Sequence, residues 1–282
     1  MSRLNRHLLC FGFGYSARAV ARRLGDGWRV TGTSRNPEEP GCVCFDRDHP
    51  LLPAEFAGVS HILVSVPPVD IGDPVLDRHA DDIARLPRLA WLGYLSTTGV
   101  YGDRAGGWVD ETSELRPSGA RGGRRVAAET GWQGLWRSHG APVHIFRLAA
   151  IYGPGRSPFD ALRAGTAKRI DKPGQVFARI HVDDLASILV ASIARPRPGA
   201  IYNVCDDEPA APDAVVAHAA GLLGLPAPPL VPFEAAGLSP MARSFYDDNK
   251  RVRNALIKSE LGTRLRYPNY RAGLAAILAA GG

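Results

Sequence analysis

The stretch FGFGYSARAV, residues 11–20, decides how the rest of the chain is interpreted. It starts at the end of an apolar run, HLLCFG, for which we predict a β-strand over residues 7–12. It continues into SARAVARRL, where apolar and charged residues recur with helical spacing, so we predict a helix over residues 16–24. Two glycines therefore stand in a short turn between a strand and a helix.

The turn carries the pattern Gly12-x-Gly14-x-x-Ala17. The first glycine permits a tight turn, the second lets the backbone approach a pyrophosphate, and the small third residue lets the helix pack closely on the strand. The free N–H groups and positive dipole end of the helix then face the phosphates. In this context the pattern predicts a dinucleotide site, with Tyr15 and Ser16 in the first helical turn. The alternative is an ordinary glycine-rich turn.

The alternation of strands and helices continues along the chain. Further strands are predicted at residues 28–33, 42–45, 61–66, 90–96, 142–149 and 179–182, and further helices at 75–86, 121–138 and 183–193. Such alternation implies right-handed crossovers and a parallel sheet that is covered on both faces. The predicted fold class is α/β, with a Rossmann-type doubly wound parallel sheet.

A smaller unit is expected beside the sheet, because the composition changes near residue 205. Helices are predicted at 209–225, 249–261 and 270–280, around an extended linker at 226–233. We therefore predict a Rossmann domain made of residues 1–149 plus about 177–205. Residues of about 150–176 plus 206–282 would form a small, mostly helical, C-terminal lobe on the substrate side.

Composition narrows the class of protein. The chain has 282 residues, of which 45% are hydrophobic and 22% charged, as expected for a globular protein. Its formal charge of +6 is spread over scattered arginines, which favours an anionic small ligand over nucleic acid. No apolar run reaches the roughly 18–20 residues of a membrane helix, and no signal-peptide pattern is present, so a cytoplasmic location without membrane contact is expected.

No metal site is expected from the cysteines. Cys10, Cys42, Cys44 and Cys205 form no C-x-x-C pair. The first three lie in apolar, strand-like runs, where buried and unreactive thiols are the favoured interpretation.

The end of the second predicted strand indicates which dinucleotide is bound. Arg35 follows Gly14 by 21 positions, where an acidic residue would bind a ribose hydroxyl and an arginine would pair with a 2′-phosphate. Ser34 and Arg35 therefore favour NADP(H) over NAD(H). In the alternative, Arg35 is solvated and Glu38 or Glu39 reaches the ribose.

Other cofactor contacts are expected where further strands end. Asp46, after the third strand, could approach the adenine amino group. Ser65, Val66 and Pro67 should lie along the nicotinamide ribose, because loops at the carboxyl ends of such strands line the crevice.

Several motifs in order resemble the extended short-chain dehydrogenase/reductase superfamily, above all its NAD-dependent epimerase/dehydratase-like members. They are YLSTTGVYGD (94–103), ETSELRP (111–117), RLAAIYGPGR (147–156), IHVDDLA (180–186) and YNVCDDEP (202–209). The resemblance covers nearly the whole chain. It is specific for the fold and much less so for the reaction.

The resemblance assigns catalytic positions, two of which are changed. A Ser or Thr that binds the reacting oxygen falls on Thr97. Aligned on A-A-E at Glu129, the family's proton-transferring tyrosine falls on Arg121 and its lysine on Arg125. Arginine stays protonated at any useful pH, so Arg121 cannot act as a general acid–base. Arg125 can still donate hydrogen bonds to ribose hydroxyls or a phosphate.

Residues 118–130, SGARGGRRVAAET, admit three interpretations. Arg121 and Arg125 share a helical face with Ala128 and Trp132, so that face should point inward and the arginines should need an anionic partner. Alternatively, the first turn is exposed and both arginines are solvated. An RGG nucleic-acid element is disfavoured, because aromatic interleaving is missing.

Other acid–base candidates lie in the motifs. Tyr101 and Tyr152 are predicted near the cleft, His181 precedes the D-D that would cap a helix, and Glu111 could line the substrate side. The resemblance places Tyr152 in the loop beneath the nicotinamide, and His181 is favoured as a structural residue.

Two functions remain. One is an NADP(H)-dependent oxidoreductase or epimerase-like enzyme with a non-standard acid–base. It would act on an anionic metabolite such as a nucleotide sugar, with Arg121, Arg125 and Arg156 near the substrate. The alternative is a non-catalytic NADP(H)-binding regulatory or sensor protein. The resemblance also suggests a homodimer formed through the helix at 121–138.

Overall fold

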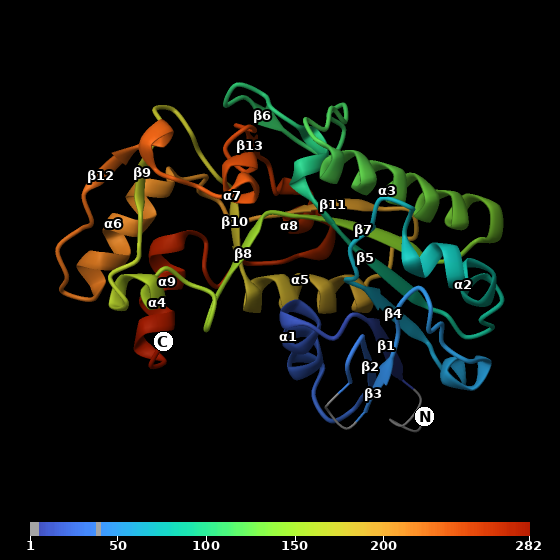
Figure 1. Ribbon diagram of the computed structural model, residues 1–282. Coiled ribbons are helices and arrows are strands. Elements are labelled where there is room, and N and C mark those ends of the chain that lie inside the picture. Colours follow the sequence, from blue (N-terminus) through green and yellow to red (C-terminus); the bar gives the residue numbers. More distant parts are fainter. Residues whose placement is uncertain (1–5, 38–40) are drawn as a thin grey trace.

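A seven-stranded parallel sheet forms the centre of the molecule (Figure 1). The computed structural model describes residues 6–37 and 41–282. The strand order is β11-β7-β5-β4-β1-β2-β3, and all neighbours are parallel. The strands are β1 (His7–Phe11), β2 (Arg29–Ser34), β3 (Cys42–Cys44), β4 (His61–Val64), β5 (Trp91–Thr97), β7 (Val143–Leu148) and β11 (Ile201–Val204). The predicted Rossmann-type α/β fold is confirmed.

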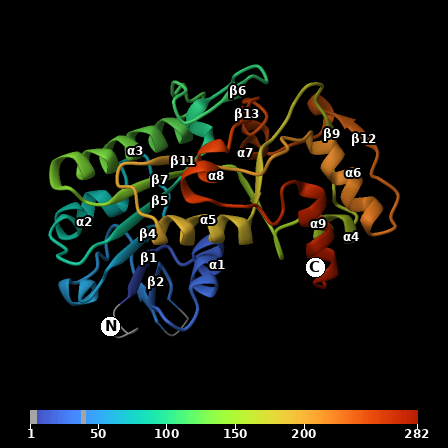
Figure 2. The ribbon, with the colours of Figure 1, turned by 180° about the vertical axis from the view of Figure 1, so that it is seen from behind.

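Helices cover both faces of the sheet because its central strands are apolar on both sides. In β1, Leu8 and Cys10 belong to one core cluster, while Leu9 and Phe11 belong to the other. The first face is covered by α1 (Tyr15–Leu24), α5 (Val182–Ala194) and α8 (Ala255–Leu261). The second is covered by α2 (Pro74–Ala84) and α3 (Ala120–His139). Figures 1 and 2 show these layers from opposite sides.

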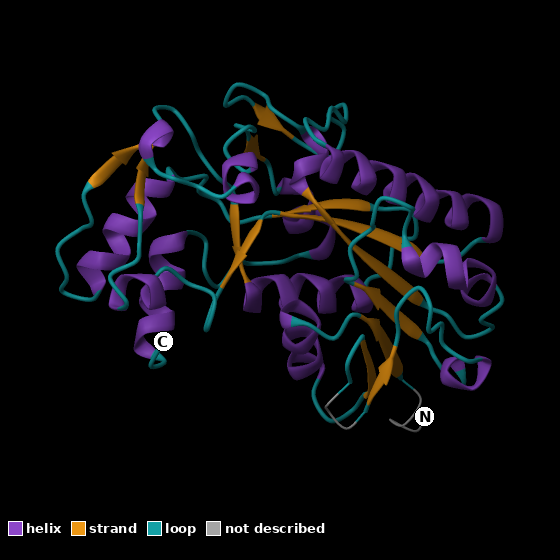
Figure 3. Ribbon diagram, in the orientation of Figure 1, coloured by secondary structure: helices purple, strands orange, loops and turns teal. Residues whose placement is uncertain are grey.

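The small lobe contains α4 (Phe159–Arg163), α6 (Pro212–Leu222), α7 (Pro240–Ser244) and α9 (Tyr270–Ala279). Three short parallel pairs accompany these helices: β8 (Ala150–Tyr152) with β10 (Arg179–His181), β9 (Arg169–Asp171) with β12 (Leu230–Pro232), and β6 (Trp108–Val109) with β13 (Arg251–Val252). Figure 3 shows the arrows of β9 and β12 beside the helices of the lobe. The lobe is therefore less purely helical than predicted.

Two predictions for the C-terminal segment were wrong. The helix predicted over 249–261 begins only at Ala255, because Arg251 and Val252 pair with β6. Its Ile257 and Leu261 then pack into the core beneath the sheet, so α8 lies against the sheet rather than with the rest of the lobe.

The sheet order places the predicted site. Because β1 lies between β2 and β4, the chain leaves β1 at the point where the strand order reverses. Ligands of open parallel sheets bind in the crevice at such a point, outside the carboxyl ends of the strands.

Candidate functional site

The glycine turn after β1 is held by its two neighbouring strands. Gly12 has a φ of +86°, and a Cβ there would lie 2.6 Å from the Ser65 Oγ. Its N–H donates to the Thr33 hydroxyl of β2 at 2.9 Å, and its carbonyl accepts from the Ser65 hydroxyl beyond β4 at 2.7 Å. Only glycine fits this position without strain. Thr33 was not predicted as a site residue, although its place in the strand across the turn was a signal for it.

The N-terminus of α1 fits a phosphate. Gly14 is its N-cap, no side chain caps its N–H groups, and its first turn has no acidic residue. A Cβ on Gly14 would meet no atom within 4 Å, so the space in front of the helix is open. Ala17 is fully buried, which lets the helix lie close to the sheet. The uncapped N–H groups and the positive dipole end leave a place for a pyrophosphate.

The Tyr15 side chain ties this turn to the small lobe. Its hydroxyl donates to the Pro154 carbonyl at 3.0 Å, and the Arg156 guanidinium lies 5.8 Å from its ring centroid. Ser16 is half-buried in the same helical turn. An exposed positive charge at Arg156 therefore stands near the predicted phosphate site.

An exposed arginine stands at the end of β2. Among the described residues, no acidic side chain pairs with Arg35, while the Ser34 hydroxyl closes a local turn onto the Asn36 carbonyl at 3.3 Å. Glu38 and Glu39, the alternative ribose ligands, lie outside the described residues. The Arg35 guanidinium is thus available to an anion.

Asp46 is engaged in a turn of its own. Its Oδ1 accepts hydrogen bonds from the Asp48 N–H at 2.8 Å, the His49 N–H at 2.9 Å and the His49 Nδ1 at 2.9 Å. These bonds, that from the His49 side chain above all, lower the pKa of the Asp46 carboxyl. Its Oδ2 is the atom left for the predicted adenine contact.

Thr97 ends β5 at the same edge of the sheet as the glycine turn. Its Oγ1 accepts from the Gly99 N–H at 3.1 Å, so its hydroxyl hydrogen remains available to a substrate oxygen. Across the edge, the N–H groups of Ser65 and Val66 both donate to the Phe11 carbonyl, at 2.9 and 3.2 Å. These bonds set the course of the loop that Pro67 continues.

The two arginines at the family's catalytic positions face different surroundings. Arg125 points inward: its Nη1 donates to the Tyr94 hydroxyl at 2.9 Å and to the Leu95 carbonyl at 2.8 Å. Arg121 is exposed and lies 5.3 Å from the ring centroid of Phe245, which follows α7. The predicted inward face is therefore right for Arg125 and wrong for Arg121, which stands one turn earlier, where α3 projects past the sheet.

Tyr101 is not free to exchange protons with a substrate. It is fully buried, donates to the Asn203 Oδ1 at 2.7 Å and accepts from the Arg147 Nη1 at 2.9 Å. Burial raises the pKa of Tyr101 to about 12. The neighbouring Glu111 carboxylate accepts from the Asn203 N–H at 2.8 Å, so it too serves the fold.

Tyr152 and His181 are also engaged. The Tyr152 ring is buried and its hydroxyl donates to the Asn269 carbonyl at 3.3 Å, so the hydroxyl is bound within the fold. The His181 Nδ1 accepts from the Asp183 N–H at 3.2 Å and thereby caps α5. Burial lowers the pKa of His181. The structural interpretation of His181 agrees with these contacts.

A buried ion pair that was not predicted from the sequence lies beside the end of β5. Glu129 and Arg147 pair at 2.8 Å with side chains 5% and 4% exposed, and the Ser96 hydroxyl donates to Glu129 at 2.5 Å. Ser96 directly precedes Thr97. The signal was present, since Glu129 ends the A-A-E register and Arg147 opens the RLAAIYGPGR motif.

Two absences concern the described residues only. Residues 6–37 and 41–282 contain no group of three or more His, Cys, Asp or Glu that could hold a metal ion. Nor does any helix in those ranges combine the length and apolar character needed to span a bilayer.

The cysteines differ in exposure. Cys10 is buried, but Cys44 is exposed, against the prediction, because β3 is the edge of the sheet.

Comparisons with known proteins agree with this arrangement. The sequence model of the NAD dependent epimerase/dehydratase family matches residues 83–205. A functionally unknown conserved protein from Silicibacter pomeroyi is 54% identical, with a TM-score of 0.91 over 97% of this chain and 98% of that one. Protein YeeZ of Escherichia coli K12 is 30% identical over 66% of this chain, which spans only 60% of YeeZ.

A more distant solved structure has the same fold. The human epimerase family protein SDR39U1, whose crystal structure is with NADPH, is 19% identical and has a TM-score of 0.73. The match covers 97% of this chain and 99% of that one.

Proposed function

We propose that this chain, whose residues 83–205 match the model of the NAD dependent epimerase/dehydratase family, is an NADP(H)-dependent oxidoreductase acting on a small anionic metabolite. One observation supports this proposal above all: an open glycine turn follows β1, and the exposed Arg35 follows the neighbouring strand β2. Gly12, Gly14 and Ala17 would hold the pyrophosphate, and Ser34 and Arg35 the 2′-phosphate. The human neighbour of the same fold has NADPH in its structure.

The residues around the carboxyl end of β5 define the proposed substrate side. Bound NADP(H) supplies hydride chemistry. The Thr97 hydroxyl would donate to the substrate oxygen, while Arg121 and Arg156, both exposed, would attract a carboxylate or phosphate. Arg125 would hold the start of α3 against β5, since its Nη1 is already bound to the Leu95 carbonyl. Water would provide the proton that the family's tyrosine normally transfers.

A specific observation favours a second candidate, an NADP(H)-binding protein without turnover. Tyr101, Tyr152 and His181, the residues that might have replaced the tyrosine, are all bound within the fold. Both candidates use the same cofactor site, so they differ only in the presence of chemistry. The homodimer through α3 stays a prediction.

The cofactor assignment is tested by binding NADPH and NADH to the wild type and to Arg35→Ala. A charge-assisted contact contributes about 1.5–3 kcal/mol, so Arg35→Ala should weaken NADPH binding about 10–150-fold. NADH binding should change less than about threefold, because it lacks the 2′-phosphate. The matched control is Arg29→Ala, an exposed arginine at the opposite end of β2, which should change neither affinity. Equal losses for both cofactors would show that Arg35 does not meet the 2′-phosphate.

Turnover separates the two candidates. The wild type should oxidise NADPH with at least one member of a panel of carboxylated, phosphorylated and nucleotide-sugar carbonyl compounds. Thr97→Ala should lower kcat about 100-fold, as expected when a donor to the reacting oxygen is removed, and Thr97→Ser should restore most of it. Thr98→Ala is the control. Tight NADPH binding with no turnover across the panel would favour the non-catalytic candidate.

A further inference from the structure

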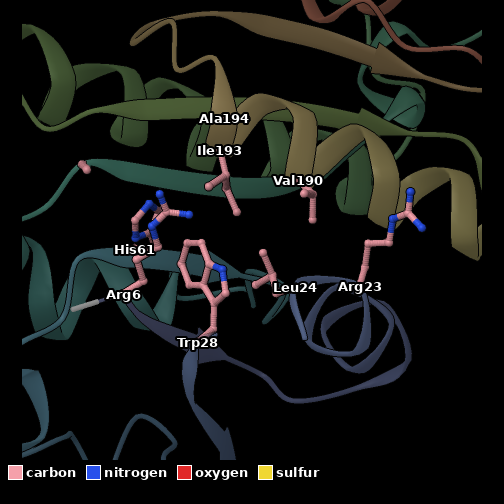
Figure 4. A pocket seen from close by; sticks show the side chains of 9 residues that line it. Arg6, Arg23, Leu24, Trp28, His61, Val190, Ile193 and Ala194 are labelled. Carbon is pink, nitrogen blue, oxygen red and sulfur yellow. The ribbon is translucent and has the colours of Figure 1, made fainter. Parts of the chain in front are cut away.

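A cavity of about 510 Å³ lies at the amino ends of the strands, the edge opposite the proposed cofactor site (Figure 4). It opens between the ends of α1 and α5. The lining residues are Arg6, Arg23, Leu24, Trp28, His61, Ala90, Val190, Ile193 and Ala194. None of them takes part in the proposed cofactor or substrate contacts, so the cavity is a separate feature.

The side chains that line the cavity are suited to the apolar part of a small ligand. Leu24 from α1 faces Val190 and Ile193 from α5, and the half-buried Trp28 indole lies between the two helix ends. The His61 ring packs edge-on against Trp28, with centroids 4.6 Å apart. A volume of this size is typical of pockets for small molecules, which are mostly apolar with a few polar groups.

The charges at the cavity are positive and unpaired. The Arg6 guanidinium lies 5.5 Å from the Trp28 ring centroid, and Arg23 stands at the other end (Figure 4). Within residues 6–37 and 41–282, no acidic side chain forms an ion pair with either arginine. The C-terminal ends of α1 and α5 add only about half a negative charge each, so two full positive charges exceed them.

His61 adds a polar group without adding charge. Its Nδ1 is 2.9 Å from the Ser60 hydroxyl. Burial, assisted by the charge of Arg6, lowers the pKa of His61 to about 4, so the imidazole is neutral near pH 7. The positive potential of the cavity therefore comes from the two arginines.

We propose that this cavity is a second binding site, for a small amphipathic monoanion whose flat aromatic or aliphatic body lies against Trp28 and whose carboxylate is held by Arg6 or Arg23. Burial of the body between α1 and α5 provides affinity, and the guanidiniums select the charge. The site does not depend on the proposed function, because it shares no residue with the cofactor turn.

The test uses three probes of one shape: 4-phenylbutyrate, 4-phenylbutan-1-ol and 4-phenylbutylamine. Calorimetry on the full chain, with and without NADPH, should show the acid binding at least tenfold more tightly than the alcohol or the amine. Equal affinities for the three probes, or acid binding weaker than millimolar, would overturn the proposal. NADPH binding is measured separately, so its failure would count against the cofactor site alone.

Variants locate the site. The double variant Arg6→Gln with Arg23→Gln, and the single variant Ala194→Trp, should each weaken binding of the acid at least fivefold, the first by removing both charges and the second by filling the cavity. The matched control is Arg22→Gln, an exposed neighbour on α1 that does not line the cavity and should leave binding unchanged. Unchanged binding in Ala194→Trp would place the probe elsewhere. Concentration-dependent self-association that Ala194→Trp abolishes would assign this face to a second copy of the chain, against the proposal.

Discussion

At the scale of single residues, the site rests on a buried charge network. Arg147 donates to Glu129 through its Nε and Nη2 and to Tyr101 through its Nη1, and all three side chains are buried. Burial disfavours charged groups, but the hydrogen bonds that Arg147 donates to Glu129, together with the charge of Glu129, help raise the pKa of Arg147 above its usual value. A buried pair of this kind is costly to break, because one charge is then left without a partner.

Removing one charge of this pair should destabilise the protein strongly. Glu129→Gln keeps the shape of the side chain but leaves Arg147 uncompensated, so unfolding free energy should fall by about 3–5 kcal/mol. Glu114→Gln is the matched control, since the Glu114–Arg116 pair is 65% and 63% exposed and should contribute less than about 1 kcal/mol. Urea denaturation measures both; similar losses in the two variants would contradict the expectation.

The two arginines of α3 show where reasoning from the sequence ends. Helical spacing correctly grouped Arg125 with Ala128 and Trp132 on the face that meets the sheet. The same spacing could not say that α3 extends beyond the sheet at Arg121, because that depends on where β5 ends. Arg121 is consequently exposed beside Phe245, a residue more than 100 positions away in the chain.

At the scale of elements, strands with long apolar runs were predictable and short strands were not. Six of the seven strands of the sheet were predicted, and the central ones were recognisable because their side chains are buried on both faces. β11 was not predicted as a strand, and the strand predicted at 179–182 is β10, which pairs with β8 outside the sheet. The pairs formed by β9 with β12 and by β6 with β13 are only two or three residues long. Their pairing depends on contacts far apart in the chain, and local propensity carries little information about such contacts.

Asp73 connects two helices on one face of the sheet. It is the N-cap of α2, accepting from the N–H groups of Val75 and Leu76 at 2.9 and 3.2 Å. Its second oxygen accepts from the Trp132 Nε1 of α3 at 3.2 Å. One buried carboxylate thus both starts α2 and satisfies the buried indole of its neighbour.

Loss of Asp73 should therefore cost more than loss of an ordinary cap. Asp73→Ala removes a cap, at about 1 kcal/mol, and leaves a buried indole N–H unbonded, at about 1–3 kcal/mol, so a total of about 2–4 kcal/mol is expected. Ser239→Ala removes the exposed cap of α7 and should cost no more than about 1 kcal/mol. Chemical denaturation compares them, and a loss for Asp73→Ala no larger than that for Ser239→Ala would contradict the linking role.

At the scale of the whole molecule, the small lobe meets α3 through an exposed contact. Phe245 is 53% exposed, and the Arg121 guanidinium lies over its ring. Exposed cation–π contacts contribute about 0.5–1 kcal/mol, which is small beside the stability of a domain. Tyr246 is buried and packs against Phe177 and Phe233, whereas residues 240–245 are exposed or half-buried. Residues 240–245 should therefore be able to open without unfolding of the sheet.

Phe245→Ala should speed local opening of this segment. Losing about 0.5–1 kcal/mol corresponds to amide exchange about 2–5-fold faster over residues 240–245, with the melting temperature nearly unchanged. Arg121→Ala should give the same increase, and Met241→Ala, an exposed apolar residue of the same helix, should not. Amide hydrogen exchange followed by mass spectrometry measures these rates. Identical rates in all variants would show that the Arg121–Phe245 contact does not hold the segment.

The strand order of the sheet also determines when each strand can pair while the chain is being synthesised. β7 remains an unpaired edge until β11 has been made, roughly 50 residues later, which takes about 3–10 s at ~5–20 residues per second. During that interval Tyr101 lacks its Asn203 acceptor, because Asn203 belongs to β11. The nascent chain thus carries its complete glycine turn while one flank of the sheet is still open to other strands.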